Sequence, residues 1–375
     1  MVVGVHRVAQ LEINQAALQH NIAAIKSIWT KQKLLLVVKA NAYGHGAVQV
    51  AKVGKKAGAD GFCVALLDEA LELRKAGLVD DPILVLGVTD LDAVYVAQKY
   101  DISLTVTSVE LLQSIHETFK TFGNQKPIRI HLPIDTGMGR LGLRKLADIE
   151  SYIDILKRYP DEFVFEGMFS HFSTSDEVDQ SYFNQQVEKF KKILAKLDEL
   201  PPYVSLANSA AAIWHPELSK ISNTIRYGIS ACGIDPSDAN LKLPFELEET
   251  MKLTSELVYV KQVGPNESIG YGATYTTSES EWIATIPVGY ADGYSRRMAG
   301  FYVLVDGQKM PIVGRICMDQ LMIRLSKAYP VGTKVTLMGT DRGEQISAQA
   351  IADQCGTIPH EIFCNFSVRL PRVYH

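Results

Sequence analysis

Between residue 14 and about residue 230, short apolar runs alternate with amphipathic stretches. This alternation is typical of repeated strand–helix units around a parallel sheet. Eight such units match a (β/α)8 TIM barrel in number and length, so we predict an α/β fold of this kind, with a doubly wound open sheet as the competing architecture. The runs with the composition of buried strands are residues 34–38, 62–66, 83–86, 102–106, 128–132, 164–169, 203–207 and 224–227.

Two helical segments are especially clear in the sequence. Asn14 is a good N-cap, and the residues behind it repeat with a helical period along one face: Leu18, Ile22, Ile25 and Trp29. The longest amphipathic stretch covers residues 176–200. Both segments separate predicted strands, as the barrel topology requires.

The character of the sequence changes after about residue 244. From there on, β-rich segments are interrupted by Gly and Pro, which predicts a mostly antiparallel domain with one or two helices near residues 347–364. We therefore expect a barrel domain of residues 1–243 and a β-rich C-terminal domain of residues 244–375. Residues 1–12 are strand-like with no helix before them, so they are candidates to pair with the C-terminal domain instead of the barrel.

The composition excludes several classes of function. The net charge of the 375-residue chain is −4, and no stretch concentrates Lys and Arg, which argues against a nucleic-acid partner. The sequence has no run of about 18 apolar residues and no signal-peptide pattern, so we expect a cytoplasmic protein without a membrane partner. The five cysteines form no CxxC pair and no zinc-type cluster, so we expect reduced thiols and no metal.

Lys39 is the first candidate for chemistry. It directly follows the predicted strand 34–38, and barrel enzymes place their catalytic groups where strands end. Apolar walls at a barrel mouth favour the neutral amine, which is the form that a Schiff-base lysine needs. The alternative is an ordinary surface lysine after a strand.

Other predicted strands also end in polar residues. The loops after the last two strands of a barrel commonly bind phosphate, which suits Ser209, Gly228 and Ile229. A lysine, such a phosphate cradle and an arginine, Arg226, at one barrel mouth together indicate a phosphorylated aldehyde cofactor. The remaining polar candidates are Arg140 in the turn DTGMGR, His171, Asn208 and Arg226. The alternatives are that DTGMGR is a structural turn, that His171 is a hydrogen-bonded core histidine, and that Arg226 is a buried arginine paired with a carboxylate.

Eight motifs spread along the chain fit one family. They are VVKANAYGHG with Lys39, DTGMGRLG at 135–142, HFSTSDE at 171–177, NSAA at 208–211, RYGI at 226–229, YGATYT at 271–276, GYADGY at 289–294 and GRICMDQ at 314–320. With these motifs the chain resembles the alanine racemase family over essentially its full length. The resemblance implies a barrel plus a β-domain, pyridoxal 5′-phosphate as cofactor, a homodimer with shared active sites, and interconversion of L- and D-alanine that supplies D-alanine for peptidoglycan.

The resemblance also implies roles for individual residues. Lys39 would carry the cofactor and act as one base, and Tyr271 from the partner chain would act as the second base. Arg140 would orient Tyr271, the cofactor's phenolic oxygen and the substrate, and Arg226 would face the pyridine nitrogen with His171 behind it. The further residues implied at the cofactor are Tyr43, Asn208, Ser209, Gly228 and Ile229, and those implied at the substrate are Tyr290, Met318 and Asp319.

Two positions depart from the family's pattern. Pro133 in HLPIDTG stands where the family usually has a lysine, commonly carbamylated, whose negative charge positions Arg140. We expect a bound inorganic anion or ordered waters to take its place. Val368 in SVRLPR replaces an active-site tyrosine, which enlarges the expected pocket.

Three other functions compete with alanine racemisation. A racemase with a broadened alanine and serine range is favoured by Val368. A fold-related amino-acid decarboxylase needs a carboxylate at the pyridine nitrogen, which Arg226 in RYGI argues against. A non-catalytic pyridoxal-phosphate carrier would leave the β-rich domain with Tyr271 unexplained.

Overall fold

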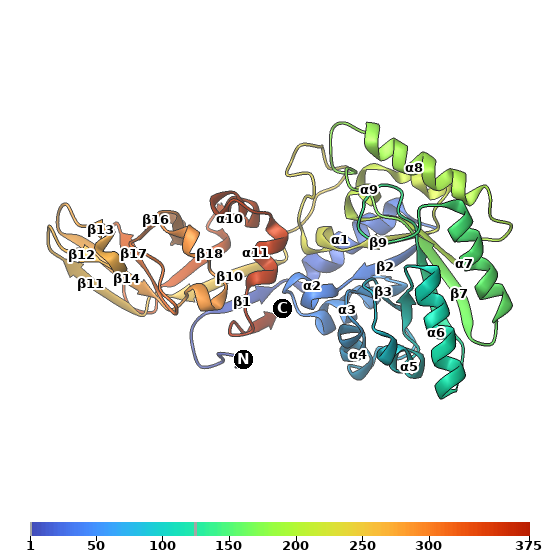
Figure 1. The fold of residues 1–375 in the computed structure, drawn as a ribbon. Coiled ribbons are helices and arrows are strands. Elements are labelled where there is room, and N and C mark those ends of the chain that lie inside the picture. Colours follow the sequence, from blue (N-terminus) through green and yellow to red (C-terminus); the bar gives the residue numbers. More distant parts are fainter. Residues whose placement is uncertain (1, 124–125) are drawn as a thin grey trace. The chain divides into compact units, whose positions relative to one another are not determined.

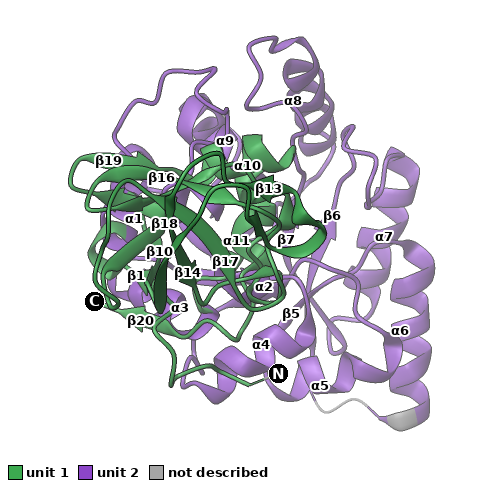
Figure 2. Cartoon of the chain, turned by 90° about the vertical axis from the view of Figure 1, so that its left-hand side faces the viewer, with its two compact units in different colours: residues 1–17, 43–46, 249–375 green, residues 18–42, 47–248 purple. Residues whose placement is uncertain are grey.

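The computed structural model describes residues 2–123 and 126–375 (Figure 1). By its internal contacts the chain divides into two compact units (Figure 2). The barrel unit comprises residues 18–42 and 47–248, and the sheet unit comprises residues 1–17, 43–46 and 249–375. In the described part of the chain, no helix combines the length and apolar composition needed to cross a bilayer.

The barrel unit is built on a closed barrel of parallel strands, which confirms the predicted TIM-type fold. The first and last strands of the barrel pair with each other, with Leu35 opposite Arg226, and this pairing closes the barrel. The open-sheet alternative is therefore wrong. Nearly every strand position is buried, which explains why continuous apolar runs marked them in the sequence. The strands are β2 (Lys33–Val37), β3 (Gly61–Val64), β4 (Ile83–Val85), β5 (Ser103–Thr105), β6 (Ile128–Pro133), β7 (Phe163–Phe169), β8 (Tyr203–Ala207) and β9 (Thr224–Tyr227).

Helices alternate with these strands along the chain. Asn14 caps the first helix, α1 (Gln15–Ile28), by accepting a hydrogen bond from the Ala17 backbone N–H at 3.0 Å. Trp29, buried just beyond its end, donates its indole N–H to the Ala212 carbonyl at 2.8 Å. The helices are α1 (Gln15–Ile28), α3 (Ala47–Lys56), α4 (Leu67–Lys75), α5 (Val94–Lys99), α6 (Val109–Phe122), α7 (Leu146–Arg158), α8 (Ser181–Leu194) and α9 (Ser209–Trp214).

The sheet unit is mostly antiparallel, as predicted. Its main sheet has the strand order β11-β14-β17-β16-β15-β18-β10-β1-β20, in which β1 is antiparallel to β10 and parallel to β20. The division between the two units at Glu248 and Glu249 falls a few residues beyond the boundary expected from the sequence.

The strands of the sheet unit are β1 (Gln10–Ile13), β10 (Met251–Glu256), β11 (Tyr259–Val263), β12 (Ser268–Ile269), β13 (Tyr275–Thr276), β14 (Glu281–Ile286), β15 (Tyr302–Val305), β16 (Gln308–Val313), β17 (Leu321–Leu325), β18 (Lys334–Asp341), β19 (Glu344–Ile346) and β20 (Arg372–Tyr374). Its helices are α10 (Ala348–Cys355) and α11 (Pro359–Asn365).

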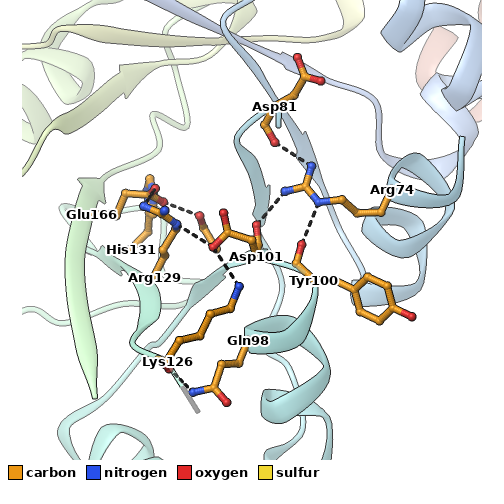
Figure 3. Close-up of polar contacts among 10 residues, drawn as sticks. Arg74, Asp81, Gln98, Tyr100, Asp101, Lys126, Arg129, His131 and Glu166 are labelled. Carbon is orange, nitrogen blue, oxygen red and sulfur yellow. Dashed lines mark hydrogen bonds and ion pairs between the residues drawn. The ribbon is translucent and has the colours of Figure 1, made fainter. Parts of the chain in front are cut away.

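A buried polar network joins three neighbouring barrel strands (Figure 3). Glu166 on β7 accepts hydrogen bonds from Ser103 on β5 and from Nε2 of His131 on β6, the latter at 3.0 Å. Arg129 adds an ion pair to the same carboxylate at 3.4 Å. A Cβ at Gly167 would collide with the His131 ring, so this position needs a glycine. Burial would raise the pKa of Glu166, but the His131, Ser103 and Arg129 contacts outweigh it and lower that pKa.

The network extends to the amino ends of the strands. Asp101, just before β5, pairs with Arg129 at 3.1 Å and with Lys126 at 3.6 Å. Arg74 on α4 donates to the backbone carbonyls of Asp81, Tyr100 and Asp101 (Figure 3). Because this end of a barrel serves stability, we assign the network to folding and not to chemistry.

Replacing Glu166 tests this assignment. Glu166→Leu leaves His131 and Ser103 buried with one partner removed, so we expect a loss of about 3–5 kcal/mol in the free energy of unfolding at neutral pH. The folded-state pKa of Glu166 is lowered, so its contribution is present above the unfolded-state pKa and disappears as the pH falls through the folded-state value. Unfolding midpoints measured across acid pH should therefore converge for the wild type and Glu166→Leu. Glu150→Leu, at an exposed position, is the control, and an equal loss there would contradict the assignment.

Candidate active site

Lys39 lies at the carboxyl end of β2 and begins a strained turn. In the segment α2 (Lys39–Tyr43), the backbone φ angles of Ala40, Asn41, Ala42 and Tyr43 are 51°, 55°, 52° and 50°. These values belong to the left-handed region, which costs L-residues about 1–2 kcal/mol each. Four consecutive non-glycine residues in this conformation need support from their surroundings, and such strain concentrates at functional sites.

Side chains of the barrel unit supply this support. The Glu69 carboxylate accepts the Ala40 N–H at 2.6 Å and, with its other oxygen, the Ala65 N–H at 2.7 Å. The Asn41 amide oxygen accepts the Ala47 N–H at 2.8 Å. Glu69 thus ties the turn that follows Lys39 to the end of the neighbouring strand β3. We did not predict this residue from the sequence; its only signal was a carboxylate in the first turn of a helix behind a strand.

Arg226 on β9 is buried and makes four short polar contacts. It donates to the Ser205 carbonyl at 2.8 Å, the Ser205 hydroxyl at 2.6 Å and the Ser170 carbonyl at 2.7 Å. Its remaining contact is with Nδ1 of His171 at 3.3 Å. Within the described ranges it forms no ion pair with a carboxylate, so a buried Arg–carboxylate pair does not account for this residue.

His171 is held neutral by its neighbours. A guanidinium only donates, so Nδ1 of His171 must accept from Arg226 and cannot carry a proton. Burial, followed by the positive charges of Arg226, Arg140 and Lys39, lowers the pKa of His171 to about 3. Burial also lowers the pKa of Arg226 to about 10, which still leaves this arginine charged at neutral pH. The barrel mouth is therefore strongly cationic.

The loops after β8 and β9 meet at Ser209. The Gly228 N–H donates to the Ser209 hydroxyl at 3.0 Å. Asn208 caps α9 by accepting the Ala211 N–H at 2.9 Å. Beside Ile229, the buried Ser230 hydroxyl lacks a hydrogen-bond partner among the described residues. This grouping of hydroxyl and backbone N–H groups beside a cationic mouth suits a phosphate.

Arg140 lies on the loop after β6, in a turn organised by Asp135. One oxygen of Asp135 accepts the N–H groups of Gly137 and Gly139, both at 3.0 Å, and the other pairs with Arg144 at 2.7 Å. Asp135 is therefore engaged elsewhere and does not neutralise Arg140. Arg140 is exposed and has no ion pair with any carboxylate that the structure describes. Pro133, the last residue of β6, stands where the family pattern has the lysine that was expected to pair with Arg140.

The remaining predicted residues lie in the sheet unit. A pocket of about 540 Å³ there is lined by Tyr271, Met318 and Asp319 together with Gly270, Cys317 and Gln320. The Tyr290 N–H donates to the Cys317 carbonyl at 3.1 Å, which places the Tyr290 backbone next to this pocket. The Tyr271 side chain is 71% exposed, which is unusual for an aromatic residue.

Tyr43, predicted at the cofactor, and Val368, which departs from the family pattern, also belong to the sheet unit by their contacts. Tyr43 packs edge-on against His360, with ring centroids 5.9 Å apart. Val368 is half-exposed at 44%.

Comparisons with known proteins identify the chain's relatives. Residues 13–236 match the family model "Alanine racemase, N-terminal domain" and residues 250–374 match "Alanine racemase, C-terminal domain". The alanine racemase of Ligilactobacillus salivarius is 47% identical over 375 residues, covering 100% of both chains.

Solved structures of two racemases are also similar to this chain. The crystal structure of alanine racemase from E. faecalis superposes with a TM-score of 0.97 at 48% identity, covering 100% of both chains. A histidine racemase from Leuconostoc mesenteroides subsp. sake superposes with a TM-score of 0.93 at 33% identity, covering 100% of this chain and 99% of that one.

The surroundings of Arg140 lead to a prediction about anions. With Asp135 paired to Arg144, we expect chloride to bind beside Arg140 and stabilise the folded state, by about 1.4 kcal/mol at ten times its dissociation constant. Unfolding midpoints in sodium chloride and sodium gluconate of equal ionic strength measure the effect. Bicarbonate should have no influence, since Pro133 has no amine to carbamylate. Equal chloride stabilisation of the Arg140→Ala variant, or none in the wild type, would contradict this prediction.

Proposed function

Because the chain belongs to the alanine racemase family of pyridoxal-phosphate-dependent isomerases, we propose that it holds pyridoxal 5′-phosphate at the mouth of its barrel unit and interconverts L- and D-alanine with two bases, Lys39 and Tyr271. The site would be completed by a second copy of the chain in a homodimer. A cytoplasmic location and the supply of D-alanine for peptidoglycan are part of the same proposal.

The observation that carries the proposal is the cationic barrel mouth. Three positive side chains surround the neutral His171, and neither Arg140 nor Arg226 forms an ion pair among the described residues. An anionic cofactor with a phosphate and a phenolic oxygen fits this charge. Ser209 with the backbone of Gly228 and Ile229 would hold the phosphate, and Lys39 would take the aldehyde. When bound, this group serves as an electron sink that makes the α-hydrogen of an amino acid acidic.

Arg226 determines how strong this electron sink is. Its guanidinium donates to four acceptors, one of which is His171, and an arginine stays protonated. Arg226 can therefore donate a hydrogen bond to the ring nitrogen of the cofactor but does not transfer a proton to that nitrogen. An unprotonated ring nitrogen withdraws fewer electrons, which favours return of the proton to the α-carbon and suppresses transamination. A decarboxylase needs the stronger sink that a carboxylate at this place provides, so Arg226 disfavours that function.

Racemisation requires one base on each face of the α-carbon. The Lys39 amine, at the end of β2, would remove or return the proton on one face. On the other face a phenol is a poor base unless a cation stabilises its ionised form, and we assign that role to Arg140. Tyr271, exposed beside the pocket of the sheet unit, would act in the site of the second copy.

A broadened alanine and serine racemase is the second candidate. It is favoured by Val368, whose small side chain stands where the family pattern has a tyrosine. A non-catalytic carrier is disfavoured, because it would give the Tyr271 pocket no role.

Mixing two inactive variants tests the proposal. Lys39→Ala should lose both racemisation and the visible absorption band of the bound cofactor, and Tyr271→Phe should lose racemisation alone. When equal amounts are dissociated and reassembled, we expect about a quarter of the wild-type activity, since about half of the dimers are mixed and each mixed dimer has one intact site.

The measurement is the rate of D-alanine formation from L-alanine, with mixed dimers quantified by differential tags. Retention of the visible band in Lys39→Ala would remove the basis for the cofactor assignment. Mixed dimers that form but stay inactive would show that Lys39 and Tyr271 do not act in one shared site.

Val368→Tyr tests the substrate range. We expect the wild type to racemise serine as well as alanine, because a pocket discriminates one small added group by only about 1–3 kcal/mol. The kcat/KM ratio of serine to alanine should fall in Val368→Tyr and stay unchanged in the control Val331→Tyr, at an exposed position of the same unit. Strict alanine specificity in the wild type would exclude the broadened function.

A further inference from the structure

Gln186 on α8 is a buried glutamine that bonds to two loops at once. Its side-chain amide donates to the His171 carbonyl at 3.0 Å and to the Thr136 hydroxyl at 3.3 Å. Its oxygen accepts from the Ser173 N–H at 3.1 Å and from the Ser173 hydroxyl at 3.2 Å. The residue has no exposed surface. One side chain therefore connects the loop after β6, which carries Arg140, to the loop after β7, which carries His171.

The helix approaches the first loop very closely. Tyr182, one turn before Gln186, donates its hydroxyl to the Gly137 carbonyl at 2.8 Å. A Cβ at Gly137 would lie 2.6 Å from the Tyr182 hydroxyl and 3.3 Å from Cγ of Gln186, so only a glycine leaves room for this contact. Thr136, in addition, shares a 2.8 Å hydrogen bond with the Ser170 hydroxyl.

This anchoring reaches Arg140 through a short and rigid turn. Asp135 holds the N–H groups of Gly137 and Gly139, the latter directly before Arg140. Since Arg140 forms no ion pair in the described part of the chain, the backbone of this turn sets where its guanidinium lies. The same guanidinium is close enough to act electrostatically on both His171 and Arg226.

We propose that Gln186 is a positioning residue for the racemase reaction: by tying Thr136 to the His171 backbone, it fixes Arg140 relative to Arg226 and His171. The inference rests on the proposed function, in which Arg140 stabilises the ionised form of Tyr271. Gln186 itself contacts no reacting atom. It acts by limiting the movement of the loop that presents Arg140, and a displacement of about 1 Å in a catalytic group can cost about 100-fold in rate.

The test compares two substitutions of Gln186 with a neighbouring control. Gln186→Leu removes all four hydrogen bonds, and Gln186→Glu keeps an acceptor for Ser173 but cannot donate to His171 or Thr136. We expect both to lower kcat about 10- to 100-fold at saturating pyridoxal 5′-phosphate, with the visible absorption band and the cofactor dissociation constant unchanged. Gln185→Met, at the exposed neighbouring position, should keep the wild-type kcat.

A double-mutant cycle separates positioning from general structural support. If Gln186 acts through Arg140, then adding Gln186→Leu or Gln186→Glu to Arg140→Ala causes no further loss of kcat. Losses that multiply in the double variant, an unchanged kcat in Gln186→Glu, or an equal loss in Gln185→Met would each overturn the proposal. If Gln186→Leu does not fold, Gln186→Glu decides the question. Racemisation by the wild type is measured first, so failure of the proposed function is recognised separately.

Discussion

Burying the guanidinium of Arg226 costs free energy unless each of its N–H groups finds an acceptor. The acceptors come from the two preceding strand ends, as carbonyls of Ser170 and Ser205, a serine hydroxyl and the ring nitrogen of His171. None of these partners carries a negative charge. The partners of Arg226 therefore leave its positive charge unneutralised, and His171 is forced into its neutral form.

The turn after Lys39 shows how side chains of the barrel unit hold a strained backbone in one conformation. Its left-handed residues cost about 1–2 kcal/mol each, and the Glu69 and Asn41 side chains offset part of that cost with hydrogen bonds to the backbone. A relaxed right-handed turn would lose the hydrogen bond from the Ala40 N–H to Glu69. The strain thus lies in the turn directly behind Lys39, the base assigned in the proposed function.

The sequence predicted the barrel well because its strands are buried on both faces and read as continuous apolar runs, from 34–38 to 224–227. Residues at strand ends, such as Lys39 and Ser209, could be predicted as site residues from their place in that pattern. Glu69 and Gln186 could not, since each resembles an ordinary polar helix residue until the fold brings its distant partners together. The helix α8 is shorter at both ends than the predicted amphipathic stretch of residues 176–200: it begins at Ser181, whose N–H donates to Asp179 at 2.8 Å, and it ends at Leu194.

The most direct test of this account is the ratio of racemisation to transamination when the charge at position 226 is reversed. Arg226→Glu would place a carboxylate facing the ring nitrogen, which would keep that nitrogen protonated and so strengthen the electron sink. We expect D-alanine formation to fall about 10²–10³-fold, as is typical when one electrostatic group is lost from an active site. We expect pyruvate formation from alanine to rise. Arg226→Lys, which keeps the charge, should leave pyruvate formation at the wild-type level. If pyruvate formation by Arg226→Glu also stays at the wild-type level, the cationic barrel mouth does not control the chemistry and the account is wrong.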